Sequence, residues 1–131
     1  MTSEQINLAV AAIAGWTDII VWQPERDLPV KTYQGTNPAH PECGTFVPDY
    51  INDLNAIILL LESLNIYPVI DFTDDRVYYG EYIFDFSQEF EVALALCRLL
   101  IAINPTPIAP IQVAIIDDDG EIESVFEAEF E

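Results

Sequence analysis

Apolar and polar residues alternate along this chain with a period that changes from segment to segment. Near the N-terminus, Ile6, Val10 and Ile13 recur at the spacing of one helical face, which predicts an amphipathic helix. The segment Thr2–Gln5 has the pattern of a capping box. Gly15 stands where the apolar stripe stops, and glycine commonly ends helices. The first predicted element is therefore a capped helix that ends before Gly15.

Two further apolar runs predict helices. The segment 49–64 carries a stripe of Leu and Ile behind Asp49, a residue type that caps helices. The segment 87–103 begins at a second capping residue, Ser87, and is apolar nearly all the way round. Such a helix is expected to be buried on more than one side. Strands are predicted over 18–22, 66–72, 77–86, 111–116 and 121–130.

Alternation within two of these strands assigns their faces. In the segment 77–86, treated as one strand, Tyr78 and Tyr82 share an aromatic face. In the segment 121–130, Ile122 and Phe126 share an apolar face, and the glutamates occupy the opposite face. An Asp-Gly pair precedes this last strand, so the last two strands are expected to form a hairpin.

One long segment, 24–48, shows no clear period. It contains five prolines and two glycines, which favours an irregular loop. Loops of this length are usually functional or disordered. It also holds the metal-capable residues His40, Glu42 and Cys43, but a structural zinc site needs four ligands, so no metal is expected there.

The net charge of the chain limits the classes of macromolecule that it is expected to bind. The chain has 4 basic and 23 acidic residues, for a net charge of −19. Nucleic acids are bound through clustered Lys and Arg, and anionic membranes attract the same residues, so direct binding to either is not expected. A basic protein surface is the electrostatically matched partner. An acidity that serves only solubility is the alternative.

The cysteines and the apolar runs indicate a compartment. Cys97 lies within an apolar helical run and Cys43 lies in the proline-rich segment, so a disulfide framework is not expected. The N-terminus lacks the positive charge of a signal peptide. No stretch approaches the roughly 20 apolar residues of a membrane span. We therefore expect a cytoplasmic protein.

Three ordered motifs resemble the phage ABA sandwich domain family. They are Gly15-Trp16 after the first helix, the Pro-to-Ala segment 48–56, and the segment 93–98 with the order Ala-x-Ala-x-Cys-Arg. The resemblance covers about residues 4–103. It implies a phage or phage-derived setting and an α/β/α sandwich with a central, mostly antiparallel sheet. It implies no activity and no catalytic residue.

Taken together, these features predict a single α+β domain over residues 1–131. The expected fold is a three-layer α/β/α sandwich with three helices, a mostly antiparallel sheet and a C-terminal β-hairpin. Residues 4–103 would form the core that resembles the family. Residues 111–131 would then be an appended acidic hairpin, because they lie outside the resemblance.

Catalysis and cofactors are not expected. A nucleophile–histidine pair would need His40, which has no evident third partner, and no glycine-rich phosphate loop is present. The acidic segment 117–121 lacks the ligand spacing of an EF-hand. Turn chemistry between two strands explains it better. We therefore expect no enzyme, no metal and no cofactor.

The acidic residues of the hairpin are the candidate partner-binding site. Two interpretations stay open: charged residues that prevent unwanted strand addition, and a row of carboxylates that imitates phosphates in a basic groove. The candidate residues are Asp117, Asp118, Asp119, Glu121, Glu123, Glu127 and Glu129.

The functional hypothesis is a small acidic phage-derived protein that binds a basic host protein. Its concrete form is stoichiometric inhibition of a nucleic-acid-binding defence protein. One alternative is a small-ligand binder that uses the segment 24–48 and the aromatic face at Tyr78 and Tyr82. Another is a structural or assembly accessory protein. A homodimer is expected, because the predicted helices carry more apolar surface than one sheet layer can cover.

Overall fold

The computed structural model of the chain describes residues 2–22, 32–38, 44–104, 108, 110–116, 121–128 and 130. The helices are α1 (Ser3–Ala14), α2 (Leu54–Ser63), the short 3-10 helix η1 (Glu89–Glu91) and α3 (Val92–Ile103). The strands are β1 (Thr17–Trp22), β2 (Thr32–Thr36), β3 (Gly44–Phe46), β4 (Val69–Asp71), β5 (Arg76–Tyr79), β6 (Tyr82–Asp85), β7 (Ile111–Ile116) and β8 (Ile122–Ala128). Among the described residues, no helix is both long and apolar enough to cross a bilayer.

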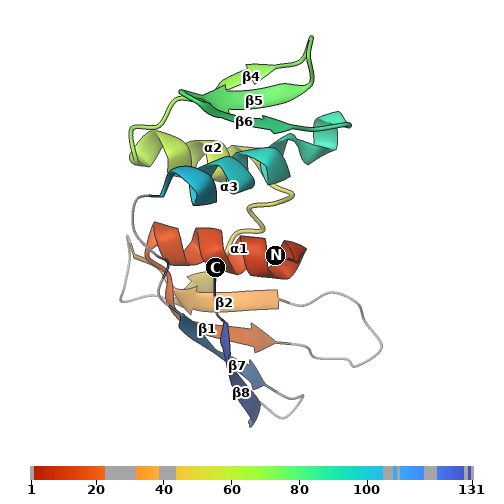
Figure 1. Cartoon of the computed structure of the whole chain (residues 1–131). Coiled ribbons are helices and arrows are strands. Elements are labelled where there is room, and N and C mark those ends of the chain that lie inside the picture. The colour runs from red at the N-terminus through yellow and green to blue at the C-terminus, as the bar shows by residue number, and fades with distance from the viewer. Residues whose placement is uncertain are drawn as a thin grey trace. The chain divides into compact units, whose positions relative to one another are not determined.

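These elements group into two compact units (Figure 1). The first unit contains Met1–Val10 and Asp49–Pro107, and the second contains Ala11–Pro48 and Ile108–Glu131. Helix α1 contributes residues to both units. The chain therefore passes from the first unit to the second, returns to the first through α2 and α3, and ends in the second.

The predicted capping box of α1 is confirmed. The Thr2 N–H donates to Gln5 Oε1 at 2.7 Å, and the Gln5 N–H donates to Thr2 Oγ1 at 3.2 Å. The two residues thereby satisfy backbone N–H groups that have no partner inside the helix. Gly15 follows α1 with φ of 96°, a conformation that glycine adopts without steric cost.

Two other predicted caps are wrong. Asp53, and not Asp49, caps α2, because the Asp53 side chain accepts a hydrogen bond from the Ala56 N–H at 3.1 Å. Ser87 does not cap α3, which begins after η1. The Ser87 hydroxyl instead donates to the Glu91 carboxylate at 3.0 Å. In both cases several polar residues compete near the helix start, and only the local backbone path selects among them.

In the first unit, α3 packs against β5, β6 and α2. Figure 1 shows the three-stranded sheet of this unit lying along α2 and α3. The expectation that α3 is buried on more than one side is confirmed. Apolar residues occur on nearly every side of this helix, which explains its burial. Its buried residues are Val92, Ala93, Ala95, Leu96, Cys97, Leu99 and Leu100.

The single strand predicted over 77–86 is wrong, because the chain reverses at Gly80. Gly80 has φ of 61°, and β5 and β6 pair antiparallel on either side of it. Tyr79 pairs with Tyr82, so Tyr82 shares a face with Tyr79 and not with Tyr78. The predicted aromatic face at Tyr78 and Tyr82 therefore does not exist.

The second unit is built on a five-stranded sheet in the order β3-β2-β1-β7-β8. β1 and β7 are parallel, and every other neighbouring pair is antiparallel. The irregular loop predicted over 24–48 is wrong in part, because β2 and β3 lie inside it. Both are short, and β2 reads Thr-Tyr-Gln-Gly-Thr, so neither produces an apolar run that would mark a strand.

One face of this sheet is buried. Ile19 pairs with Val113, and both side chains are almost fully buried. Trp16 is buried beside Gly35, where an added Cβ would stand 3.3 Å from the Trp16 ring and 3.0 Å from the Thr17 carbonyl oxygen. Gly35 is therefore required for the close approach of β2 to the Trp16 side chain.

The predicted α+β class is confirmed, with three α-helices, mostly antiparallel pairing and a β7–β8 hairpin at the C-terminus. The described strands are divided between two sheets and do not form one. The hairpin also differs from the appended element of the expectation. β7 lies between β1 and β8, so it is an internal strand of the five-stranded sheet.

Candidate functional site

The second face of the five-stranded sheet is exposed and largely apolar, and we call it the open face. It is defined by the cross-strand row Ile20, Ala114 and Val125, which the register places side by side on β1, β7 and β8. Val125 is 55% exposed. On β2 and β3 the same row continues with Gln34 and Phe46. Sheet faces that contact only water are usually polar, so neighbouring apolar residues on this face favour a binding surface.

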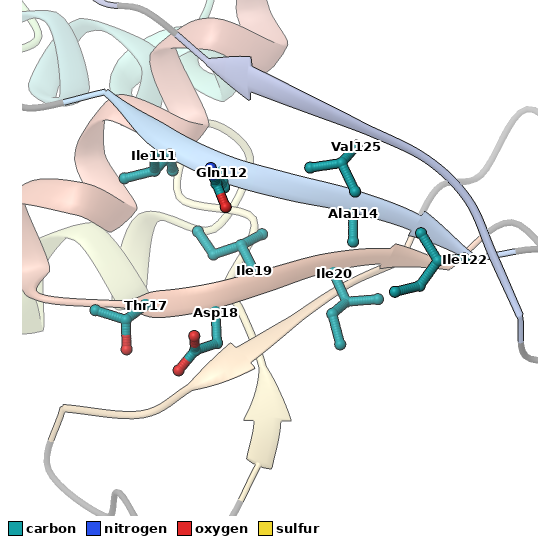
Figure 2. Close-up of a pocket in the computed structure, with 9 residues that line it drawn as sticks. All are labelled: Thr17, Asp18, Ile19, Ile20, Ile111, Gln112, Ala114, Ile122 and Val125. Atoms are coloured by element: carbon teal, nitrogen blue, oxygen red, sulfur yellow. The ribbon is translucent and has the colours of Figure 1, made fainter.

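The open face is hollowed into a groove of about 490 Å³. Figure 2 shows the side chains that line it, which come from the three neighbouring strands β1, β7 and β8. This volume lies within the roughly 300–1,000 Å³ range of ligand-binding clefts. The lining residues are Thr17, Asp18, Ile19, Ile20, Ile111, Gln112, Ala114, Ile122 and Val125.

One end of the groove is polar. Asp18 and Thr17 lie at the start of β1, and Gln112 lies next to the Val113 position that pairs with Ile19. Glu127 is the cross-strand partner of Gln112. Because β-strand side chains alternate, Gln112 and Glu127 share the open face with Ala114 and Val125. The polar row therefore carries carboxylates on both sides of an amide.

A β-bulge fixes Asp18 at this end. The β1–β2 register shifts between Thr17 and Ile20, and Asp18 has φ of 53°, which is unusual for a residue other than glycine. The Thr36 hydroxyl donates to Asp18 Oδ2 at 3.1 Å. Bulges re-aim side chains and recur beside functional sites. Here the bulge and the Thr36 hydrogen bond hold an exposed carboxylate at the mouth of the groove.

A second irregularity places Ile122 on the open face. The β7–β8 register shifts at Ile115 and Ile116, so that Ile116 pairs with Ile122 while Ile115 pairs with Ser124. Ile122 is 66% exposed and lines the groove. The prediction that Ile122 shares a face with Phe126 is therefore wrong, because one extra residue in β8 reverses the alternation.

The acidic residues predicted as the binding site are placed only in part. Glu121, Glu123 and Glu127 are exposed on or next to β8, which is an edge strand of the sheet. Val125 and Ile122 share the open face with Glu127, so the carboxylates do not form an unbroken row. The other predicted residues, Asp117, Asp118, Asp119 and Glu129, lie outside the described residues.

Sequence reasoning missed the polar end of the groove altogether. Thr17, Asp18 and Gln112 come from strands that are about 90 residues apart in the chain and adjacent in the sheet. Each residue alone is an ordinary polar residue at a strand end. Only the parallel β1–β7 register brings them together, and no local pattern encodes that register.

A smaller hollow of about 150 Å³ lies in the first unit, beside α2 and β4. Its lining is almost entirely apolar, and Glu62 is its one charged residue. Its polar side chains are Glu62 and Tyr67, and its volume is about a third of that of the groove on the open face. We therefore regard the groove of the open face as the stronger candidate site.

The remaining chemistry-bearing residues are the metal-capable side chains and the cysteine thiols. Within the described ranges, no three His, Cys, Asp or Glu side chains are grouped so that they could hold a metal ion. The predicted metal-capable residues His40, Glu42 and Cys43 lie outside those ranges. Cys97 is buried, and this burial, with a smaller contribution from the Asp49 charge, raises the pKa of its thiol to about 12. A neutral, buried thiol is a core residue and not a nucleophile.

Comparisons with protein-family models, with curated proteins and with solved structures found no match to this chain.

Proposed function

We propose that this chain is a non-catalytic binding protein that contacts a basic partner protein through the open face of its five-stranded sheet. The observation that carries the proposal is the apolar groove with carboxylates at its rim. Protein interfaces commonly combine an apolar centre with a polar rim. The exposed residues Ile122 and Val125 supply the centre, Asp18 lines the groove, and the exposed Glu127 is the cross-strand partner of the lining residue Gln112.

Charge supports a basic partner. The chain carries a net charge of −19, so its field attracts a positively charged surface and accelerates the encounter. The edge strand β8 adds Glu121, Glu123 and Glu127 next to the groove. A basic partner would therefore meet carboxylates both on the open face and along its edge.

The concrete form of the proposal is a stoichiometric inhibitor of a nucleic-acid-binding host protein. Such proteins present basic grooves, which an acidic surface of similar spacing can occupy. The phage setting and the bacterial cytoplasm belong to this proposal. They rest on the three motifs that resemble the phage ABA sandwich domain family.

Affinity capture followed by a competition assay tests this function. The immobilised chain should retain a basic protein from a bacterial lysate, and that protein's binding to nucleic acid should fall as the chain is added in equal amounts. The variant Glu121→Gln, Glu123→Gln, Glu127→Gln removes three charges while retaining side-chain shape, and it should lose most of the effect.

A matched variant controls for net charge. Glu62, Glu81 and Glu89 are exposed residues of the first unit and do not line the groove, so their replacement by Gln removes the same number of charges from other positions. We expect this control to inhibit nearly as well as the unmodified chain. Equal loss in both variants, or a captured protein that still binds nucleic acid, would contradict the proposal.

A small-ligand binder is the second candidate, and the groove volume of about 490 Å³ favours it. The ligand site would be this groove, since the predicted aromatic face does not exist. Native mass spectrometry of the purified chain separates the two functions. A bound small molecule that Val125→Glu displaces would favour the ligand-binding function. The third candidate, an assembly accessory protein, would be favoured if the captured protein is a large oligomer whose assembly depends on the chain.

A further inference from the structure

We infer that the groove receives an extended segment of the partner that carries a basic residue and, two positions further on, an apolar residue. This inference rests on the proposed function and specifies the chemistry that the groove would recognise. It follows from the order of polar and apolar rows on the open face, from their spacing and from the sign of the charge around them.

The first element of recognition is the polar row. Asp18 lies at the mouth of the groove, and Glu127 lies across Gln112 on the neighbouring strand. Carboxylates accept hydrogen bonds from Lys and Arg, and these charge-assisted bonds are stronger than neutral ones. No basic residue lines the groove among the described residues. This row therefore suits a cationic side chain of the partner.

Asp18 is arranged for this role before any partner arrives. Its Oδ2 already accepts the Thr36 hydroxyl at 3.1 Å, and its backbone lies at φ of 53° within a bulge. The second oxygen, Oδ1, can accept a further hydrogen bond. A carboxylate held in this way loses less conformational freedom when it binds a cation.

The second element is the apolar row Ile20, Ala114 and Val125, which lies two residues further along the strands. The regular repeat is that of β7, where Gln112 and Ala114 are two residues apart and are separated by about 6.6 Å, whereas the bulge at Asp18 interrupts this repeat on β1. An extended segment that lies along β1 and β7 has the same repeat, so its residues at i and i+2 face successive rows. Packed sheets also align their strands within about 30°. At such an angle, the side-chain spacing of the partner segment still matches the spacing of the rows on the open face.

Charge distinguishes this occupant from a second copy of the chain. Asp18 is the one charged residue that lines the groove, and each copy carries a net charge of −19. Placing the same face of another copy over the groove would bring carboxylates together, which costs binding energy. A basic segment instead neutralises the polar row.

A peptide titration tests the inference with defined probes. The probe is the acetylated, amidated peptide Thr-Arg-Thr-Ile-Thr, added to the full-length chain while backbone amide shifts are recorded by NMR. We expect saturable shifts at Thr17, Gln112 and Val125. A peptide with Glu in place of Arg, and one with Arg and Ile adjacent, should bind at least about fivefold more weakly, since a lost charge pair or a lost apolar contact is worth about 1 kcal/mol.

Two pairs of variants assign the contacts. Asp18→Asn keeps the side-chain shape and tolerates positive φ, and it should weaken the Arg peptide about fivefold. Its control is Asp75→Asn, because Asp75 is also exposed and also has φ of 53° but lies in the first unit. Val125→Thr should weaken binding about threefold, while Val69→Thr on β4 should leave it unchanged.

Several results would overturn the inference. They are equal binding of the Arg and Glu peptides, an equal effect of Asp18→Asn and Asp75→Asn, shifts that map away from the groove, or groove shifts that depend on the concentration of the chain alone. The captured partner separates this inference from the proposed function. If the glutamate variant of β8 loses the partner while Asp18→Asn and Val125→Thr retain it, the binding of a basic partner stands, its contact lies on the β8 carboxylates and not in the groove, and the inference fails.

Discussion

Cys97 shows how burial of one side chain sets a pH dependence for the whole protein. Its thiol is fully buried, and its pKa is raised from 9.0 to about 12 by loss of hydration, with a smaller contribution from the charge of Asp49. In the unfolded chain the thiol ionises near pH 9, whereas in the folded chain it stays neutral. Stability from this residue is therefore complete below pH 9 and decreases as the pH rises toward 12.

This prediction can be measured by urea unfolding between pH 7 and 11. The free energy of unfolding should decrease with a steeper slope above pH 9 in the unmodified chain than in Cys97→Ala, which has no thiol at this position. Using Cys97→Ala as the reference removes the contribution of every other ionisable group, because the two chains share them. Identical slopes would show that Cys97 is accessible to water or ionises in the folded state.

At the residue scale, contacts between residues close in the sequence could be predicted. Contacts that depend on the register between distant strands could not. Thr2 and Gln5 lie three positions apart, so their reciprocal hydrogen bonds follow from local sequence alone. The burial of Cys97 likewise fits the apolar helical run in which it lies. Asp18, by contrast, derives its importance from a bulge and from Gln112 on a distant strand, and neither has a local signal.

The cap of α2 provides a test at the scale of an element. Asp53 accepts the Ala56 N–H at 3.1 Å, whereas Asp49 accepts a side-chain hydrogen bond from Asn52 at 2.9 Å. Asp53→Ala should lower the free energy of unfolding by about 1 kcal/mol, because it leaves a helical N–H without a partner. Asp49→Ala removes only an exposed contact and should cost less than about 0.5 kcal/mol. Thermal or urea unfolding of both variants decides which residue is the cap. A larger loss of unfolding free energy in Asp49→Ala than in Asp53→Ala would show that Asp49 is the cap.

The elements that sequence reasoning found and missed differ in one physical respect. In helices α1 and α3, and in the hairpin strands β7 and β8, apolar residues recur often enough to mark the element in the sequence. β2 and β3 are short and surrounded by proline and glycine, so the strand conformation of β2 depends on pairing with β1, and that of β3 depends on pairing with β2. β5 and β6 were merged because Gly80 reverses a chain whose apolar alternation continues on both sides of the turn.

The bulge in β8 has the largest consequence for the candidate site. Alternation counted along the sequence assigns Ile122 to the face of Phe126, but the extra residue moves Ile122 to the open face. A bulge leaves no regular mark in an alternating pattern, since it changes the register by a single position. The sequence therefore predicted an acidic face on β8, and the structure places an apolar groove beside its carboxylates.

At the scale of the whole molecule, self-association and partner binding should respond to salt in opposite ways. The homodimer stays a prediction, and in the first unit Leu59, Val69 and Ile83 are exposed apolar residues that could support it. Its formation brings together two chains that each carry a net charge of −19. We expect sedimentation at micromolar concentration to give about twice 14.7 kDa, with more dimer at higher salt, because screening reduces the repulsion. A mass of 14.7 kDa at every salt concentration would exclude the dimer.

The most direct test of the central claim is the affinity of the captured partner as a function of ionic strength. If carboxylates at the rim of an apolar groove bind a basic surface, the affinity should fall at least about tenfold between 0.05 M and 0.5 M salt, because exposed charge pairs are screened. Some affinity should remain at high salt, since the contacts of the apolar row Ile20, Ala114 and Val125 do not depend on screening. An affinity that is unchanged across this range would contradict electrostatic recognition of a basic partner.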